Sequence, residues 1–165
     1  MKVFSKICSV LSTLLLILLA VVAGLFVLPM VFGCKNLAVL SGSMEPEIPV
    51  GAVVYVKETD VNDIETGDVI TYRLPGGTMV THRVVSADRE GQQFITKGDA
   101  NQVEDASPVA FSQVVGKELF HVPFLGYLSI YSKTPIGIVA VCGVLIVLIL
   151  LYFLPGVLGA EEERK

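Results

Sequence analysis

Two long apolar stretches limit what this chain can fold into. They cover residues 7–32 and 136–154 of a 165-residue chain. A helix of about 20 apolar residues crosses a bilayer, so each stretch predicts a transmembrane helix. The first stretch also resembles a secretory signal peptide, but it exceeds the roughly 7–15 apolar residues of a cleavable one. We therefore expect two retained transmembrane helices.

The charges around the first span predict its orientation. Lys2 and Lys6 precede it without any acidic residue, which favours a cytoplasmic N-terminus. Residues 1–6 and the tail 155–165 are then predicted to be cytoplasmic, and residues 33–135 extracytoplasmic. The basic residues of this middle region do not oppose the assignment, because long folded domains are translocated largely regardless of charge.

Composition excludes several classes of function. The formal net charge of −4 gives no basic surface for nucleic acid, so we expect no nucleic-acid partner. The sequence has no phosphate-binding glycine loop and no Cys/His cluster with zinc spacing. Its three cysteines, Cys8, Cys34 and Cys142, do not suggest a disulfide framework, since two lie in or beside the apolar stretches.

The region between the spans is predicted to be one β domain of roughly 100 residues. Short runs rich in β-branched and aromatic residues alternate with turn signals, and no stretch shows convincing helical periodicity. The expected strands are 53–56, 69–72, 78–85, 93–97 and 114–121. The fold class is therefore mainly β: a small, mostly antiparallel barrel or folded sheet flanked by two transmembrane helices.

A polar segment reading Ser-Gly-Ser-Met-Glu-Pro follows the first span at residues 41–46. Ser, Gly and Pro are common turn residues, and a turn alone explains them. A serine on a tight turn beside a rigid proline also presents its hydroxyl, as a nucleophile requires. Whether residues 41–46 form only a turn or also present a nucleophile depends on whether the chain supplies a base.

The sequence offers two histidines and several loop carboxylates. His121, between Phe120 and Val122, is interpreted as structural or interfacial. His82 lies in an expected strand among valines, where an isolated histidine is more often a core residue than a catalyst. Asp99 and Asp105 follow in a loop that solvation alone explains. Serine, histidine and carboxylate are nevertheless the inventory of serine hydrolysis, in which the base activates the hydroxyl and the acid orients the base.

These motifs resemble those of type I signal peptidases, over nearly the whole chain. Residues 41–46 fit the family's Ser-x-Ser-Met-x-Pro pattern at every fixed position, and residues 67–70 fit its Gly-Asp-Val/Ile segment. Residues 81–85 resemble the form with histidine in place of lysine, typical of endoplasmic-reticulum and archaeal enzymes and found in Gram-positive bacteria. Residues 97–101 contain a Gly-Asp-x-Asn box, and residues 122–126 resemble the segment before the C-terminal span.

The resemblance implies roles for individual residues. The second serine of the motif, Ser43, is the expected nucleophile, and His82 the expected base. The hydroxyl of Ser41 and the backbone N–H of Ser43 are the expected oxyanion donors. Asp105 is the expected third catalytic residue and Asp99 the expected support of its loop, with the reverse assignment left open.

The implied activity is cleavage of signal peptides from exported preproteins after small residues in an Ala-x-Ala pattern, without a cofactor. The implied place is the outer face of the plasma membrane. The expected partners are signal peptides, the lipid bilayer and the secretion translocon. Two alternatives remain: a membrane-anchored β domain that scaffolds export substrates without catalysis, and a self-cleaving repressor-type peptidase with a Ser-Lys pair.

Overall fold

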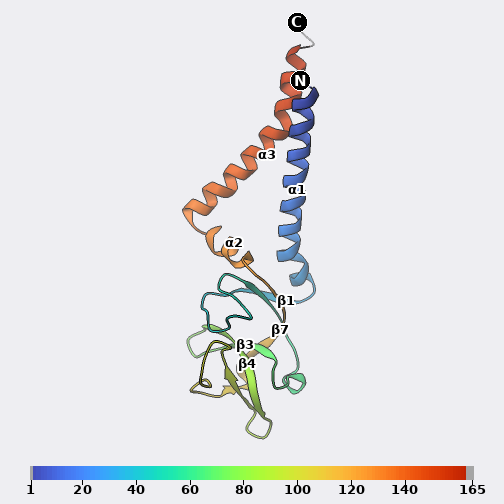
Figure 1. Cartoon of the computed structure of the whole chain (residues 1–165). Helices are drawn as coiled ribbons and strands as arrows, with labels where there is room; N and C mark the ends of the chain where they lie inside the picture. Colours follow the sequence, from blue (N-terminus) through green and yellow to red (C-terminus); the bar gives the residue numbers. More distant parts are fainter. Residues whose placement is uncertain (1, 163–165) are drawn as a thin grey trace. The chain divides into compact units, whose positions relative to one another are not determined.

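The computed structural model describes residues 2–162 (Figure 1). It divides into two compact units. One is the β unit, Pro29–Ile130, and the other is a helical unit formed by the residues before and after it. The functional residues predicted from the sequence all belong to the β unit.

Two helices make up most of the helical unit: α1, Lys2–Val31, and α3, Pro135–Glu162. Both contain a segment long and apolar enough to cross a membrane, Lys6–Val31 in α1 and Pro135–Phe153 in α3. Residues 2–6 continue α1, and residues 155–162 continue α3 beyond the expected span. Residues 1 and 163–165 of the expected cytoplasmic ends lie outside the described residues.

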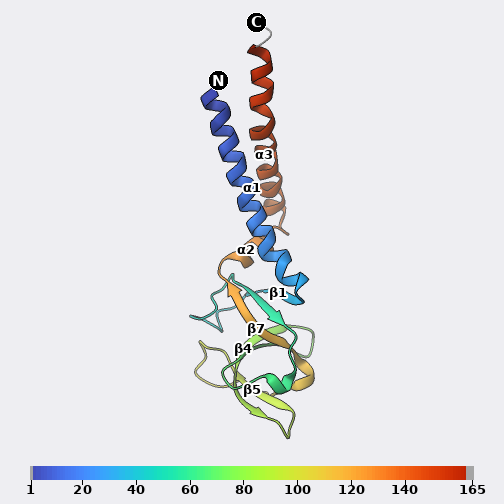
Figure 2. The same ribbon diagram turned by 90° about the vertical axis from the view of Figure 1, so that its right-hand side faces the viewer.

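The β unit is built on one seven-stranded sheet in the order β1-β2-β7-β3-β4-β5-β6, and every neighbouring pair is antiparallel. The sheet curls round its own interior (Figure 2), so the predicted fold class is confirmed. Its strands are β1 Cys34–Ala38, β2 Val53–Lys57, β3 Val69–Arg73, β4 Met79–Asp88, β5 Gln93–Lys97, β6 Val109–Ala110 and β7 Val114–Val122.

Three elements of this unit were not expected from the sequence. β1 contains Lys35 and Asn36 and pairs on one side with β2, so it lacks the apolar pattern of an inner strand. β6 is only two residues long. A short helix, α2 (Leu125–Tyr131), lies where no helical periodicity was evident, and 3₁₀ turns form at Val61–Asp63 and Phe111–Gln113.

Two apolar clusters stabilise the β unit, and the first anchors the loop between β1 and β2 to the sheet. In the first, Met44 and Ile48 pack with Val54 and Val56 of β2. In the second, buried side chains of β3, β4 and β5 meet, among them Tyr72 and Phe94. Burial of Met44, at 2% exposure, anchors the serine motif to the core. The sheet is thereby coupled to the loop that carries the predicted nucleophile.

Candidate active site

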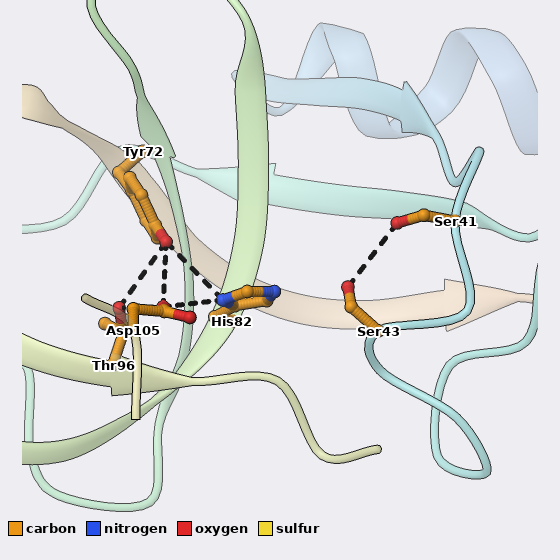
Figure 3. A network of polar contacts seen from close by, with 6 residues as sticks. All are labelled: Ser41, Ser43, Tyr72, His82, Thr96 and Asp105. Atoms are coloured by element: carbon orange, nitrogen blue, oxygen red, sulfur yellow. Dashed lines mark hydrogen bonds and ion pairs between the residues drawn. The ribbon is translucent and has the colours of Figure 1, made fainter. Parts of the chain in front are cut away.

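Ser43 lies on the loop between β1 and β2, and its backbone is anchored on two sides. The next residue, Met44, is buried in the core, and the carbonyl oxygen of Ser43 accepts a 2.9 Å hydrogen bond from the N–H of Ala100. The Ser43 hydroxyl oxygen lies 3.5 Å from that of Ser41 (Figure 3). The loop therefore presents both hydroxyl groups from a fixed backbone.

His82 lies on β4, paired with Ile70 of β3, and is only 8% exposed. Its Nδ1 is 2.7 Å from Oδ2 of Asp105, and the other side of its ring faces Ser43 (Figure 3). Within residues 2–162 no hydrogen bond joins Ser43 to His82. Such bonds are often long in unliganded enzymes and shorten when substrate binds. The structure thus joins His82 to Asp105 and directs the ring toward Ser43.

Asp105 is held by both its backbone and its carboxylate. Its N–H donates to the carbonyl of Thr96 at 2.8 Å. Oδ2 accepts hydrogen bonds from Thr96 Oγ1 at 2.6 Å and Tyr72 Oη at 3.1 Å, in addition to its contact with His82. Burial raises the pKa of Asp105, but the hydrogen bonds and charge of its neighbours outweigh burial and lower the pKa overall. The site therefore favours the carboxylate form.

Asp99, the other acid considered from the sequence, faces a different partner. Its carboxylate accepts two hydrogen bonds from Arg83, at 2.8 Å from Nε and 2.6 Å from Nη2. Arg83 also donates from Nη1 to the carbonyl oxygen of Gly67 at 2.8 Å. The bidentate hydrogen bonds with Asp99 raise the pKa of Arg83. Asp99 thus ties its loop to β4 and the turn before β3, while Asp105 contacts His82.

Gly98 lets this loop approach the serine closely. A Cβ atom on Gly98 would lie 2.5 Å from the carbonyl oxygen of Ser43 and 3.1 Å from Nε2 of His82. It would also lie 2.8 Å from Nδ2 of the Asn101 side chain. Real Cβ atoms almost never come within 3.0 Å of other heavy atoms. Ser43, His82 and the loop meet at a point where no side chain fits.

Tyr72 and Thr96, which both contact Asp105, were not predicted from the sequence. Tyr72 lies on β3 opposite Val80, and Thr96 lies on β5 opposite Val84. In the sequence each residue occurs within a run typical of a buried strand, so nothing marks its hydroxyl as functional. A period of two does place Tyr72 on the same face of β3 as Ile70, the partner of His82. This shared face could have indicated that Tyr72 lies near His82, but only if the pairing of the two strands were known.

His121, interpreted from the sequence as structural, is on β7 opposite Val54. Its Nδ1 lies 3.0 Å from Oε1 of Glu118 on the same strand. His121 thus pairs with Glu118 and does not take part in the cluster around His82.

A cleft of about 460 Å³ lies against the serines and His82. Much of its lining is apolar and comes from β1, the serine loop and β4, including Leu37, Val39, Met44 and Val80. A volume of this order is typical of a ligand pocket, and such a lining suits apolar side chains. Ser41, Ser43 and His82 thus border one largely apolar cleft.

A family model described as "Signal peptidase, peptidase S26" matches residues 10–103. Signal peptidase I W of Bacillus subtilis (strain 168) is 47% identical over 89 residues, which cover 52% of this chain and 47% of the Bacillus protein. The signal peptidase complex catalytic subunit SEC11 of Lodderomyces elongisporus is 36% identical over 103 residues, covering 56% of this chain and 61% of that protein. The subunit SEC11C of Rattus norvegicus is 30% identical over 125 residues, covering 67% and 65%.

The chain therefore spans about half of the Bacillus relative and about three fifths of the Lodderomyces one. The family match includes Ser41, Ser43, His82 and Asp99, and ends two residues before Asp105. With more than half of its residues matched by the family model, the chain belongs to the signal peptidase, peptidase S26 family.

Proposed function

We propose that this chain is a membrane-bound serine endopeptidase that removes signal peptides from exported preproteins. The observation that carries the proposal is the 2.7 Å contact between His82 Nδ1 and Asp105 Oδ2, on a ring whose opposite side faces Ser43. Membership of the signal peptidase family supports the substrate class. Ser43 is the nucleophile, His82 the general base, and Asp105 the acid that orients it.

The reaction begins when Ser43 Oγ attacks the scissile carbonyl and His82 accepts its proton at Nε2. Asp105 accepts the Nδ1–H, which fixes the tautomer and stabilises the charged ring. His82 then donates the proton to the leaving amine. A water molecule, deprotonated by His82, hydrolyses the acyl-enzyme and restores the Ser43 hydroxyl.

Negative charge develops on the scissile oxygen during each attack. The hydroxyl of Ser41 and the backbone N–H of Ser43 are the proposed donors to this oxyanion. The 3.5 Å separation of the two hydroxyl oxygens supports this role, because it places Ser41 beside the attacking atom. Donors fixed before the reaction stabilise such charge without reorganising during it.

The substrate is proposed to bind as an extended strand along β4. β4 pairs with β3 from Met79 to Arg83, but its pairing with β5 begins only at Arg83. Its stretch before Arg83 therefore offers main-chain groups beside the apolar cleft for strand addition. The cleft would accept small side chains in an Ala-x-Ala pattern before the cut.

The proposed location is the plasma membrane, spanned by α1 and α3. Their apolar segments are long enough to cross it. The β unit then lies on the extracytoplasmic face, where signal peptides leave the bilayer and the secretion translocon. No metal or organic cofactor takes part in the mechanism.

The test uses the purified full chain in lipid with a preprotein whose signal ends in Ala-x-Ala. Ser43→Ala and His82→Ala are each expected to lower turnover by at least about 1,000-fold, because members of such a unit act together. Ser86→Ala, at an exposed position on β4, is the matched control and should retain activity. Undiminished cleavage by Ser43→Ala would disprove the assigned nucleophile.

Two further measurements define the activity. Replacing the alanine before the cut by phenylalanine should abolish cleavage, and full cleavage of that substrate would reject the proposed specificity. A serine-acylating probe should label wild type but not Ser43→Ala. A scaffold without catalysis would show no labelling that depends on Ser43.

A further inference from the structure

Three side chains converge on one oxygen atom of Asp105. Oδ2 lies 2.7 Å from His82 Nδ1, 2.6 Å from Thr96 Oγ1 and 3.1 Å from Tyr72 Oη (Figure 3). The three partners come from β4, β5 and β3 respectively. A carboxylate oxygen has two lone pairs, so three donors must share its accepting capacity.

Each hydroxyl has one proton, and the distances indicate where it goes. Tyr72 Oη is 3.1 Å from Asp105 Oδ2 but 3.5 Å from His82 Nδ1. Thr96 Oγ1 is 2.6 Å from the same oxygen but 3.5 Å from Tyr72 Oη. Because a hydrogen bond weakens as it lengthens, both protons are assigned to the carboxylate. His82 is thus one of three donors to Oδ2.

We propose that Tyr72 is a positioning residue that sets the proton affinity of His82 by competing for the Asp105 oxygen to which His82 donates. The proposal deepens the proposed function, because His82 acts there as the base. Donation by Tyr72 withdraws negative charge from Oδ2, which weakens the attraction between the carboxylate and a protonated His82 ring. Thr96 acts in the same direction, through its own bond to that oxygen.

Tyr72 remains a donor throughout the range in which a histidine works. Burial, together with the nearby negative charge of Asp105, raises the pKa of Tyr72 to about 12. Tyr72 is 3% exposed overall, and with His82 and Asp105 it lines a second cavity of about 560 Å³. Tyr72 does not line the cleft beside Ser43, so its effect on catalysis passes through Asp105 and His82.

Within residues 2–162, two titratable groups contact the His82 ring. From β3 the facing titratable group is Tyr72, and from the loop after β5 it is Asp105. Arg83 follows His82 on β4 and pairs with Asp99 of the loop after β5, so these two charges neutralise each other. A change confined to Tyr72 therefore alters the proton affinity of His82 without removing a formal charge.

The test measures the titration of His82 by NMR of ¹⁵N-histidine-labelled full chain in detergent. The two histidine signals are assigned with a His121→Gln variant. Tyr72→Phe is expected to raise the His82 midpoint, because a full carboxylate charge then faces the ring. Tyr55→Phe is the matched control, because Tyr55 is buried on β2 and stacks on Phe120. Removing the Tyr55 hydroxyl should leave the His82 midpoint unchanged.

The kinetic readout follows the same shift. In Tyr72→Phe the acidic limb of kcat/KM should move to higher pH, lowering the rate on that limb about 3- to 10-fold. KM should stay unchanged because the cleft is intact. A Tyr72→Phe midpoint equal to or below that of wild type would overturn the proposal.

Two features keep the test decisive. If Tyr72→Phe does not fold, Thr96→Val removes another donor from the same oxygen and must raise the midpoint likewise; an unchanged midpoint would then reject the proposal. The NMR titration does not depend on cleavage. A shifted midpoint in a chain without peptidase activity would reject the proposed function alone, whereas an active chain with an unshifted midpoint would reject only the role of Tyr72.

Discussion

Ser43 is fixed through its backbone, while its side chain is left available. Its carbonyl oxygen accepts from Ala100, and burial of Met44 anchors the next residue. The hydroxyl has one nearby polar partner in Figure 3, Ser41, at 3.5 Å, the outer limit of a hydrogen bond. A serine held in this way can turn its hydroxyl toward a base or a substrate without moving the chain.

Gly98→Ala should disable the site directly. Its Cβ would lie 2.5 Å from the Ser43 carbonyl oxygen, a backbone atom that must move to make room. We expect turnover to fall at least about 10-fold, because small displacements of reacting groups are costly. Cleavage kinetics of the purified variant measure this loss, and wild-type turnover would contradict the assigned contact.

A second glycine separates this effect from general destabilisation. Gly76 has a φ of 99°, yet its Cβ would meet no atom within 4 Å. Gly76→Ala should cost about 1 kcal/mol of stability through backbone strain. It should leave kcat unchanged, since the turn lies outside the cluster around His82.

The carboxylate of Asp105 predicts a pH-dependent contribution to stability. Its folded-state pKa is lowered, so its ionised form stabilises the fold above the unfolded-state pKa of about 3.9. This contribution is lost as the pH falls through the lower folded-state value. The difference in Tm between wild type and Asp105→Asn should therefore be largest near neutral pH and shrink below about pH 4.

Thermal unfolding in detergent across this pH range is the measurement. Glu104→Gln, at the preceding exposed position, is the control and should show no comparable trend. A difference for Asp105→Asn that widens on acidification would reverse the sign and contradict the lowered pKa.

At the scale of elements, the segment from Gly98 to Asp105 connects both halves of the proposed site. Ala100 binds the Ser43 backbone, Asp105 binds His82, and Asp99 fastens the segment to Arg83 on β4. The two acids therefore have separable effects. Asp99 pairs with Arg83, and Asp105 contacts His82.

Exchanging each acid for its amide separates these effects. Asp105→Asn should reduce kcat far more than Asp99→Asn, because an amide at position 105 no longer stabilises a charged His82. Asp99→Asn should lower stability by about 1–2 kcal/mol, because it weakens a partly buried bidentate pair. Kinetics and thermal unfolding of both variants provide the comparison, and the opposite order of kcat values would exchange the proposed roles.

Much of the sheet was predictable because its inner strands carry β-branched and aromatic runs; β5 begins and ends at the predicted residues. β1 and α2 were not predictable, since the stability of an edge strand or a seven-residue helix comes from its neighbours more than from its own pattern. The sequence motifs also predicted His82 and Asp105 as site residues. It could not identify Tyr72, because a strand tyrosine whose hydroxyl meets a distant carboxylate resembles any core aromatic.

At the scale of the whole molecule, the two apolar helices constrain where the β unit can act. Apolar segments precede and follow it in the chain. If both cross the membrane, its N- and C-terminal ends are tied to the same face of the bilayer. Cleavage would then be confined to substrates presented at that face.

Cysteine labelling tests this orientation. In a chain whose Cys8, Cys34 and Cys142 are replaced by alanine, Glu90→Cys places a thiol on an exposed turn of the β unit. A membrane-impermeant maleimide should label it in intact spheroplasts. Labelling that requires permeabilised cells would place the β unit on the cytoplasmic side and contradict the proposed topology.

The segment from Gly98 to Asp105 has a consequence for inhibition. A compound that draws this segment away from the sheet would break two contacts together. The Ser43 carbonyl would lose the hydrogen bond from the Ala100 N–H, and His82 would lose the carboxylate of Asp105. Such a compound would not need to resemble a signal peptide or occupy the cleft. Its potency would be independent of preprotein concentration, which distinguishes this mode from competitive inhibition.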